Sequence, residues 1–297
     1  MRALIIGGNR YIGKQLVQKL VESGLKVAVL NRGNLPNVQH ASVEHIKADR
    51  NNDVQMAAAF KDQYFDLIID LICQDPIQAA KSIQLFNGKT TRYILFSSTF
   101  VYPYGASVHE EQFDPKNYPI KMDPKMGTTD MRRVTEAVFM QKAPFKMLVL
   151  RVPFVFGDND PTQRLLRLTQ KIMEKQEIYF PNKNARISVI HLNDLVKAIQ
   201  HFALFPAEGI INCACETPLY VGSLIKMIES ATGKSSWFSE TESKDNVTLF
   251  SIKSDWFVDT GRLRTLGLNP KSHSGWLPPL IERIAAEMYK SDFRKSG

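Results

Sequence analysis

The chain has 297 residues, of which 44% are hydrophobic and 23% charged, so it is long enough for one large domain or two smaller ones. This composition excludes a disordered protein, and no apolar run reaches the roughly 18 residues that a membrane-spanning helix needs. The net charge of +8 suits an anionic partner, but the basic residues are scattered rather than clustered, so nucleic acid is the less favoured partner. We expect a globular, cytoplasmic protein without membrane contact.

Short β-rich segments alternate with helical patterns through the first half of the chain. The predicted strands cover residues 3–6, 26–30, 43–48, 65–71, 93–96 and 147–150. After the first strand, Ile12, Leu16 and Leu20 recur every four residues, which predicts a helix that ends near Gly24. Such strand-helix-strand units require parallel strands joined by right-handed crossovers. The sequence therefore predicts an α/β fold with a doubly wound parallel sheet over residues 1–151.

The alternation loosens after Arg151, which predicts a smaller C-terminal lobe over residues 152–297 that binds the substrate. One segment of this half is expected to return to the main sheet. The predicted elements are helices at 163–175 and 221–231, a mixed segment at 187–204, a strand at 209–212 and a mixed tail. Cys213 and Cys215 are expected on one strand face as core thiols, and the three cysteines fit a reducing compartment. No metal site is predicted.

A glycine turn, Gly7-Gly-Asn-Arg-Tyr-Ile-Gly13, connects the first strand to the first helix. We expect Gly7 to permit the sharp turn, Gly8 to keep side chains away from a pyrophosphate, and Gly13 to let helix and strand pack closely. The helix N-terminus would then face the phosphates. The turn predicts a dinucleotide site that includes Gly7, Gly8, Asn9, Arg10, Tyr11, Ile12 and Gly13.

Two basic residues near this turn favour NADP over NAD. Arg10 can reach the 2′-phosphate of NADP. Asn31-Arg32 ends the second strand, where an acidic residue would hold the 2′-hydroxyl of NAD. We therefore predict NADP as the cofactor, with NAD as the alternative. In the alternative interpretation, Arg10 pairs with surface acids and Arg32 ends a loop.

Further motifs follow in order along nearly the whole chain: Asp49, Phe96-Ser-Ser-Thr-Phe-Val-Tyr102, Leu150-Arg-Val-Pro-Phe-Val-Phe-Gly157 and His191-Leu-Asn-Asp194. With the glycine turn, they resemble the atypical, extended short-chain dehydrogenases/reductases of the NAD-dependent epimerase/dehydratase superfamily, whose branches include the chloroplast stem-loop-binding proteins. The resemblance implies a Rossmann fold in which Asp49 and Arg50 reach the adenine. It also implies that Ser98 lies beside the nicotinamide and that Pro153 and Val155 lead toward the substrate. A homodimer is left open.

Each of these residues also has a structural interpretation. Asp49 can cap a turn, Ser98 can satisfy a strand end, and His191 can cap a helix. We prefer the structural interpretation for His191 and for Asp194, which can be an acid in the first turn of a helix. Tyr102 and Arg164 are the predicted substrate contacts, because the guanidinium of Arg164 can bind a phosphate or carboxylate.

The catalytic pattern that the resemblance implies is missing. In this superfamily a Tyr acts as general acid/base, and a Lys four residues later lowers its pKa. Placing Gly127 on the family glycine puts Met126 at the Tyr position and Asp130 at the Lys position. A thioether transfers no proton, and a carboxylate supplies no positive charge. Ser98 remains the catalytic candidate. Tyr102, Tyr104 and Lys125 are candidates for a substitute acid, but we favour a surface or packing role for each of them.

Three functions are therefore carried forward. The first is an NADP-dependent oxidoreductase or epimerase of altered mechanism, which acts on a small anionic compound or a sugar nucleotide. The second is a sensor or regulatory protein that binds NADP without turnover. The third is an RNA-binding protein, which the net charge suggests, although the sequence has no aromatic RNA-binding motif. We rank them in this order.

Overall fold

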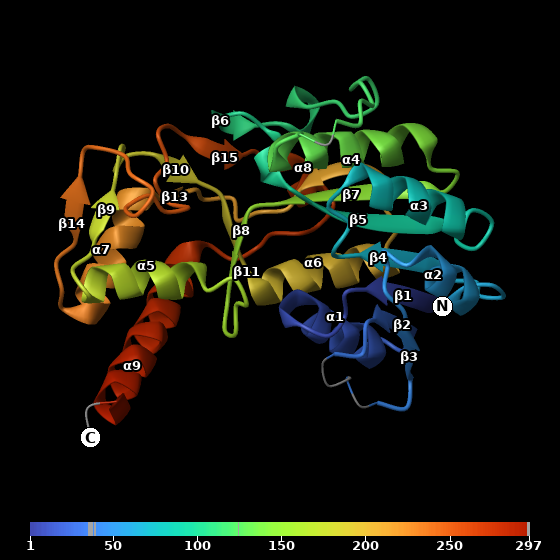
Figure 1. Cartoon of the computed structure of the whole chain (residues 1–297), viewed down its shortest axis with the longest axis horizontal. Coiled ribbons are helices and arrows are strands. Elements are labelled where there is room, and N and C mark those ends of the chain that lie inside the picture. Colours follow the sequence, from blue (N-terminus) through green and yellow to red (C-terminus); the bar gives the residue numbers. More distant parts are fainter. Residues whose placement is uncertain (35–37, 39, 124, 296–297) are drawn as a thin grey trace.

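The computed structural model describes residues 1–34, 38, 40–123 and 125–295, and it has a larger and a smaller part (Figure 1). The larger part is built on a seven-stranded sheet with the order β12-β7-β5-β4-β1-β2-β3. Every neighbouring pair of strands in it is parallel. The strands are β1 (Arg2–Ile6), β2 (Lys26–Asn31), β3 (Val43–Lys47), β4 (Leu67–Asp70), β5 (Arg92–Ser98), β7 (Lys146–Val152) and β12 (Gly209–Asn212). This is the predicted doubly wound sheet.

Helices cover both faces of this sheet because its strands are apolar on both faces. In β1, Ala3 and Ile5 pack into one core, whereas Leu4 and Ile6 pack into the other. The first core is closed by α1 (Tyr11–Glu22) and α6 (Leu192–Leu204), and the second by α2 (Asp53–Ala59), α3 (Pro76–Phe86) and α4 (Thr128–Lys142). Figure 1 shows α1 and α6 below the sheet and α3 and α4 above it.

The smaller part has its own core, which includes Phe154, Phe156 and Leu277. One of its sheets has the order β13-β10-β15-β6, and β11 pairs with β8 and β14 with β9. The elements not yet given are β6 (Gly105–Val108), β8 (Phe154–Phe156), α5 (Arg164–Met173), β9 (Glu177–Tyr179), β10 (Arg186–Ile187), β11 (Val189–His191), β13 (Leu219–Tyr220), α7 (Val221–Thr232), β14 (Trp237–Ser239), β15 (Trp256–Val258), α8 (Gly261–Thr265) and α9 (Leu277–Lys295).

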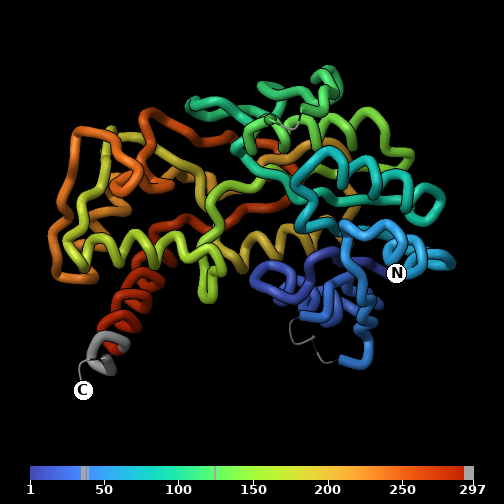
Figure 2. The backbone as a smooth tube through the Cα atoms, viewed as in Figure 1, coloured from blue at the N-terminus to red at the C-terminus, as the bar shows by residue number. Residues whose placement is uncertain are grey.

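The chain passes between the two parts several times, as the tube in Figure 2 shows. From the second half, α6 packs on α1 and β12 pairs with β7, so the chain does return to the main sheet. From the first half, β6 joins the sheet of the smaller part by pairing with β15. The two parts are therefore interleaved in sequence, although each has a separate core.

One prediction for the second half needs correction. The strand ends at Asn212, so Cys213 packs in the core beneath α6, whereas Cys215 packs in the core of the smaller part. Both are free thiols, and burial raises the pKa of each to about 12. The tail is mixed, as predicted: it contains β15, α8 and the long helix α9. In the described part of the chain, no helix is long and apolar enough to cross a membrane.

Candidate functional site

A pocket of about 450 Å³ lies at the carboxyl ends of four neighbouring strands. Ile6 and Gly7 come from β1, Asn31 from β2, Asp49 from the residues after β3, and Ile72 from those after β4. Because β1 and β4 are neighbours whose crossovers run to opposite faces, this edge is the topological switch point where open α/β sheets bind ligands. The pocket is therefore the first candidate site.

The glycine turn at this edge leaves the N-terminus of α1 open. Gly7 has a φ of +98°, which favours glycine, and a Cβ on Gly13 would overlap the carbonyl oxygen of Gly7. Arg10 is the N-cap residue, but its side chain makes no capping hydrogen bond, and the first turn of α1 contains no acidic residue. The backbone N–H groups of that turn are thus suited to an anionic ligand.

The predicted reason for a glycine at position 8 is wrong. A Cβ on Gly8 would lie 2.6 Å from Cγ1 of Val29 and 3.2 Å from Cγ2 of Val17. It would therefore point into the core between β2 and α1, and not toward a phosphate. Gly8 is required for the packing of the turn against the sheet, and its contribution to a ligand is limited to its backbone.

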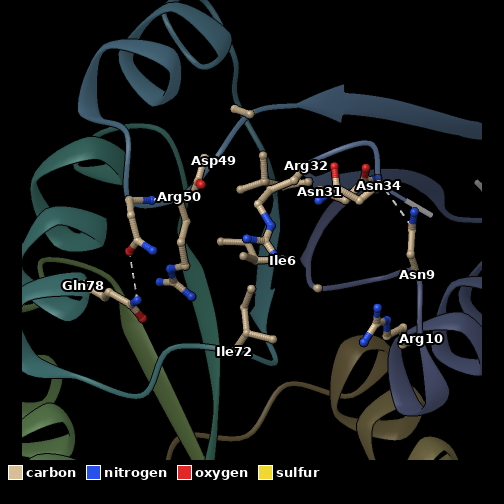
Figure 3. Close-up of a pocket in the computed structure, with 14 residues that line it drawn as sticks. Ile6, Asn9, Arg10, Asn31, Arg32, Asn34, Asp49, Arg50, Ile72 and Gln78 are labelled. Atoms are coloured by element: carbon tan, nitrogen blue, oxygen red, sulfur yellow. Dashed lines mark hydrogen bonds between the residues drawn. The ribbon is translucent and has the colours of Figure 1, made fainter. Parts of the chain in front are cut away.

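Arg10 and Arg32 both line the pocket. Both are exposed, and neither forms an ion pair with a residue that the structure describes, which removes the surface-acid alternative for Arg10. Asn31 accepts a hydrogen bond from the Gly33 backbone at 2.7 Å, and its amide donates to Oδ1 of Asn9 at 3.4 Å. Figure 3 shows Arg10 and Arg32 extending toward the pocket from the turn and from the end of β2.

Asp49 and Arg50 form another wall of the pocket, and each has a structural role. Oδ1 of Asp49 accepts from the Asn51 backbone at 2.9 Å, which holds a turn. Arg50 donates from both terminal nitrogens to the fully buried Asp70, at 2.9 Å each. Tyr93 donates to the same carboxylate at 2.6 Å. The guanidinium of Arg50 is thus already fixed by Asp70, and it lines the pocket as a rigid surface.

Ser98 ends β5 at the carboxyl edge, and its hydroxyl accepts from the backbone N–H of Phe100 at 3.2 Å. This hydrogen bond caps the 3₁₀ turn Thr99–Val101, as the structural interpretation of Ser98 anticipates. The preceding residue, Ser97, donates to Oε1 of Glu136 in α4 at 2.5 Å. Ser98 is 8% exposed, so little of it is open to a ligand.

The prediction that Tyr102 contacts substrate is wrong. Tyr102 is 2% exposed, and its hydroxyl donates to Oδ1 of Asn212 at 2.8 Å and accepts from Arg151 at 2.6 Å. Burial raises the pKa of this phenol well above its ordinary value, although the nearby guanidinium of Arg151 opposes the rise. Tyr104 is exposed and packs its ring 5.0 Å from that of Trp256.

Helix α4 carries both Asp130 and Arg132, and their surroundings differ. Asp130 is half exposed and pairs with Arg133 at 3.2 Å, while Met126 packs against the core beneath the start of α4. Arg132 lies one turn before Glu136 on the same helical face, which is the face that meets Ser97. The helix itself contains no Tyr, and its single Lys is the last residue, Lys142.

Tyr11, Val155 and Arg164 lie together on the side of the turn that faces the smaller part. The hydroxyl of Tyr11 donates to the carbonyl of Val155 in β8 at 3.3 Å. Burial raises the pKa of Tyr11 far above its ordinary value, Asp160 adds to the rise, and the positive charge of Arg164 opposes it. Pro153, just before β8, is buried. Tyr11 is thus held as a neutral phenol.

His191 and Asp194 have the structural roles that we preferred. Nδ1 of His191 accepts from the Asn193 backbone at 3.2 Å and so caps α6, and burial lowers the pKa of this imidazole. Asp194, in the first turn of α6, accepts from the Lys271 backbone at 3.0 Å. Within the residues that the structure describes, no cluster of side chains could hold a metal ion.

Sequence reasoning missed several pocket residues, namely Asn34, Asn51, Ile72 and Gln78. All four follow strand ends or lie near a helix start, where a parallel sheet places its ligand-binding loops. It also missed Arg132. The spacing of Arg132 and Glu136 was the available signal, because residues four apart share a helical face and Glu136 lies on the buried face of α4.

Comparisons with known proteins agree with this geometry. Residues 3–87 match the model of the NAD dependent epimerase/dehydratase family. This segment contains the glycine turn, the ends of β2 and β3, and Asp70. No curated protein matches the sequence.

Several solved structures share the fold over nearly the whole chain. A UDP-glucose 4-epimerase of Thermus thermophilus in complex with NAD is 17% identical, with a TM-score of 0.71, and the alignment covers 96% of this chain and 98% of that one. A Bacillus cereus UDP-glucuronic acid 4-epimerase in complex with UDP-glucuronic acid and NAD is 16% identical, with a TM-score of 0.74 and coverages of 98% and 99%. A Thermotoga maritima UDP-glucose 4-epimerase with UDP-glucose is 18% identical, with a TM-score of 0.73 and the same coverages. The segment 3–87 is therefore similar to the NAD dependent epimerase/dehydratase family, and the whole chain shares the fold of the UDP-sugar epimerases.

Proposed function

We propose that the protein binds NADP in the pocket beside the glycine turn and uses it to oxidise or reduce a small anionic or sugar-like substrate. The observation that carries this proposal is the open N-terminus of α1, beside which Arg10 and Arg32 line one pocket. When bound, NADP would supply hydride transfer. The chain itself would supply the backbone donors of the turn, the arginines and the walls of the pocket.

The charges around the pocket support NADP over the NAD of the structural neighbours. A 2′-phosphate needs positively charged donors, and Arg10 and Arg32 offer them without an ion pair to a described residue. Asn31, at the end of β2, is neutral where the family's NAD-binding members carry an acid that bonds the ribose hydroxyl. A 2′-phosphate would therefore meet positive charge and no carboxylate at that strand end.

The hydroxyl groups that the protein offers near the pocket are poorly suited to proton transfer. Ser98 is the hydroxyl nearest to the end of β5, and its oxygen already accepts a backbone hydrogen bond. Tyr11 donates to Val155, and burial raises its pKa, so it resists ionisation. With no Tyr on α4, we expect proton transfer to be slow, and turnover to be low compared with a conventional member of the superfamily.

The absence of a Tyr on α4 also favours a second candidate, a sensor that binds NADP without turnover. The two candidates differ in what happens after binding. An enzyme changes the oxidation state of the nicotinamide when a substrate is added, or interconverts two sugar nucleotides. A sensor binds one cofactor per chain and leaves it unchanged.

The test measures binding stoichiometry by calorimetry and then follows nicotinamide absorbance with UDP-glucose, UDP-glucuronic acid and sugar phosphates, with product analysis for epimerisation. Turnover that falls in Ser98→Ala but not in the exposed control Ser235→Ala supports the enzyme. Stoichiometric binding without turnover supports the sensor. If the unmodified protein binds neither NADP nor NAD, both candidates are wrong.

A further inference from the structure

Two arginines, one on α4 and one at the start of α5, have buried donor atoms without acceptors. The Nε atoms of Arg132 and Arg164 are both buried, and neither donates a hydrogen bond to any residue that the structure describes. An unsatisfied buried donor costs about 1 to 3 kcal/mol, and more when the group is charged. Because buried polar groups normally have partners, these two atoms require an explanation.

The fold places Arg132 near the end of β5 and Arg164 after β8. Arg132 lies one helical turn before Glu136, and Glu136 accepts from Ser97 near the end of β5. Arg132 is therefore carried past the end of β5. Arg164 is the first residue of α5, which follows β8. The two side chains thus come from separate elements to the same region.

The positive charge of Arg164 acts on Arg132. Burial lowers the pKa of Arg132 below its ordinary value, and the positive charge of Arg164 lowers it further. Glu136 acts in the opposite direction, but its carboxylate is bound by the fully buried Arg151 at 2.6 Å. A pair of partly desolvated like charges repels, unless an anion lies between them.

The other acids of the region have partners of their own. Asp158 pairs with Arg283 at 2.9 Å. Asp160 accepts from the backbone and hydroxyl of Thr162, at 2.7 to 2.9 Å, and so closes its own loop. Neither acid forms an ion pair with Arg132 or Arg164 among the described residues. The positive charge of the two arginines is therefore not balanced by a direct contact within the fold.

This pair of arginines is separate from the pocket beside the glycine turn. That pocket is lined by Arg10 and Arg32, and neither Arg132 nor Arg164 contributes to it. Tyr11 connects the two regions, because it begins α1 at the turn, bonds Val155 and lies in the field of Arg164. Arg132 and Arg164 thus lie on the side of the turn that faces the smaller part.

We propose that Arg132 and Arg164 form a second anion-binding site, which holds a phosphate or carboxylate group of the substrate. The inference rests on the proposed function in one respect, since it takes the dinucleotide to occupy the first pocket. Because Arg132 lies just beyond Ser97 and Ser98, the anionic group lies near the end of β5. This placement favours a small phosphorylated or carboxylated compound with its charge near the reacting carbon.

The test titrates inorganic phosphate into full-length protein saturated with NADP and follows the melting temperature. We expect Arg132→Gln and Arg164→Gln each to weaken phosphate binding about tenfold or more, because each removes a charge-assisted contact. Their NADP affinity should stay within about twofold of the unmodified protein. The matched control is Arg167→Gln, an exposed arginine one turn further along α5, which should bind phosphate normally.

Two results would overturn the proposal. One is phosphate binding that is unchanged in both variants, or reduced equally in Arg167→Gln. The other is a loss of NADP affinity with phosphate binding intact, which would mean that the pair holds the pyrophosphate of the cofactor. If Arg132→Gln does not fold, Arg132→Lys keeps the charge but loses the planar donors, and should weaken phosphate binding partially.

A failure of the proposed function would be visible separately. It would appear as no binding of NADP to the unmodified protein. The phosphate titration is therefore repeated without NADP. Phosphate must still raise the melting temperature of the unmodified protein more than it raises that of Arg132→Gln or Arg164→Gln. Loss of that difference would contradict the second site, whatever the cofactor result.

Discussion

Arg151 and Glu136 form an ion pair at 2.6 Å in which both side chains are fully buried. Arg151 also donates to the hydroxyl of Tyr102 and to the backbone carbonyls of Glu110 and Phe113. Glu136 in turn accepts from Ser97. The pair thus ties α4 and β7 to the segment 102–113 that leads into the smaller part, and it fixes the helical face on which Arg132 lies.

Breaking this pair should destabilise the protein strongly. Glu136→Gln leaves the Arg151 guanidinium buried without a countercharge, and we expect a loss of about 3 to 5 kcal/mol in the free energy of unfolding. The measurement is urea denaturation. Glu111→Gln changes an exposed acid and should stay within about 0.5 kcal/mol. A loss below about 1 kcal/mol in Glu136→Gln would mean that the buried pair contributes no more to stability than a surface pair does.

Gly8→Ala should destabilise the fold by overpacking. The new Cβ would lie 2.6 Å from Cγ1 of Val29, and such crowding costs about 1 to 3 kcal/mol. Adding Val29→Ala should restore part of the loss, because it removes the crowding atom. Gly275→Ala is the control, since nothing lies within 4 Å of its Cβ. A stable Gly8→Ala protein that only loses dinucleotide affinity would favour the original phosphate-facing interpretation.

Stability should fall as the pH drops below about 6.5. Burial lowers the pKa of His191 and of His273 below 6.5, so the unfolded chain binds protons before the folded one does. Both contributions are therefore present at higher pH and are lost as the pH falls through the unfolded value. His191→Asn keeps a capping side chain, and it and His273→Gln should each flatten the dependence between pH 8 and about 5.5.

The control for this pH series is His40→Asn, which changes an exposed histidine and should leave the slope as it is. If the unmodified protein gains stability on acidification over this range, the two partly buried imidazoles do not act in the direction stated here.

The helical face of α4 predicts where a Tyr-Lys pair would work. Thr128 and Arg132 lie on the face of Glu136, whereas Asp130 lies off that face and pairs with Arg133. Thr128→Tyr with Arg132→Lys should therefore raise the kcat for cofactor-dependent turnover of UDP-sugars, by about 10²-fold or more if proton transfer limits it. KM should rise as well, because Arg132→Lys weakens the contact with the substrate anion. Met126→Tyr with Asp130→Lys should give no comparable gain. A larger gain from Met126→Tyr with Asp130→Lys would support the alignment that places Gly127 on the family glycine.

The main sheet could be predicted from sequence because most of its strands, such as β1 and β4, are short apolar runs that are buried on both faces. The tail was harder. Leu277, Leu280 and Ile281 are spaced as in a helix, but Trp276 and two prolines at its start resemble a loop. Prolines are tolerated in the first turn of a helix, so α9 forms there.

The candidate site was predictable where one local motif forms it, and not where distant residues meet. The glycine turn lies within one strand-helix unit, and Arg10 and Arg32 line the pocket. Tyr102 resembled a substrate contact because it follows Ser98 closely, but its partners, Arg151 and Asn212, are 49 and 110 residues away. Sequence spacing alone gives no indication of such contacts.

The central claim is that the pocket beside the glycine turn binds NADP in preference to NAD. The most direct measurement is isothermal titration of the unmodified protein with each dinucleotide in the same buffer, at low ionic strength. A charge-assisted phosphate contact contributes about 1.5 to 3 kcal/mol, so NADP should bind at least about tenfold more tightly. The double variant Arg10→Gln with Arg32→Gln should lose this preference. NAD binding as tightly as NADP to the unmodified protein would contradict the account.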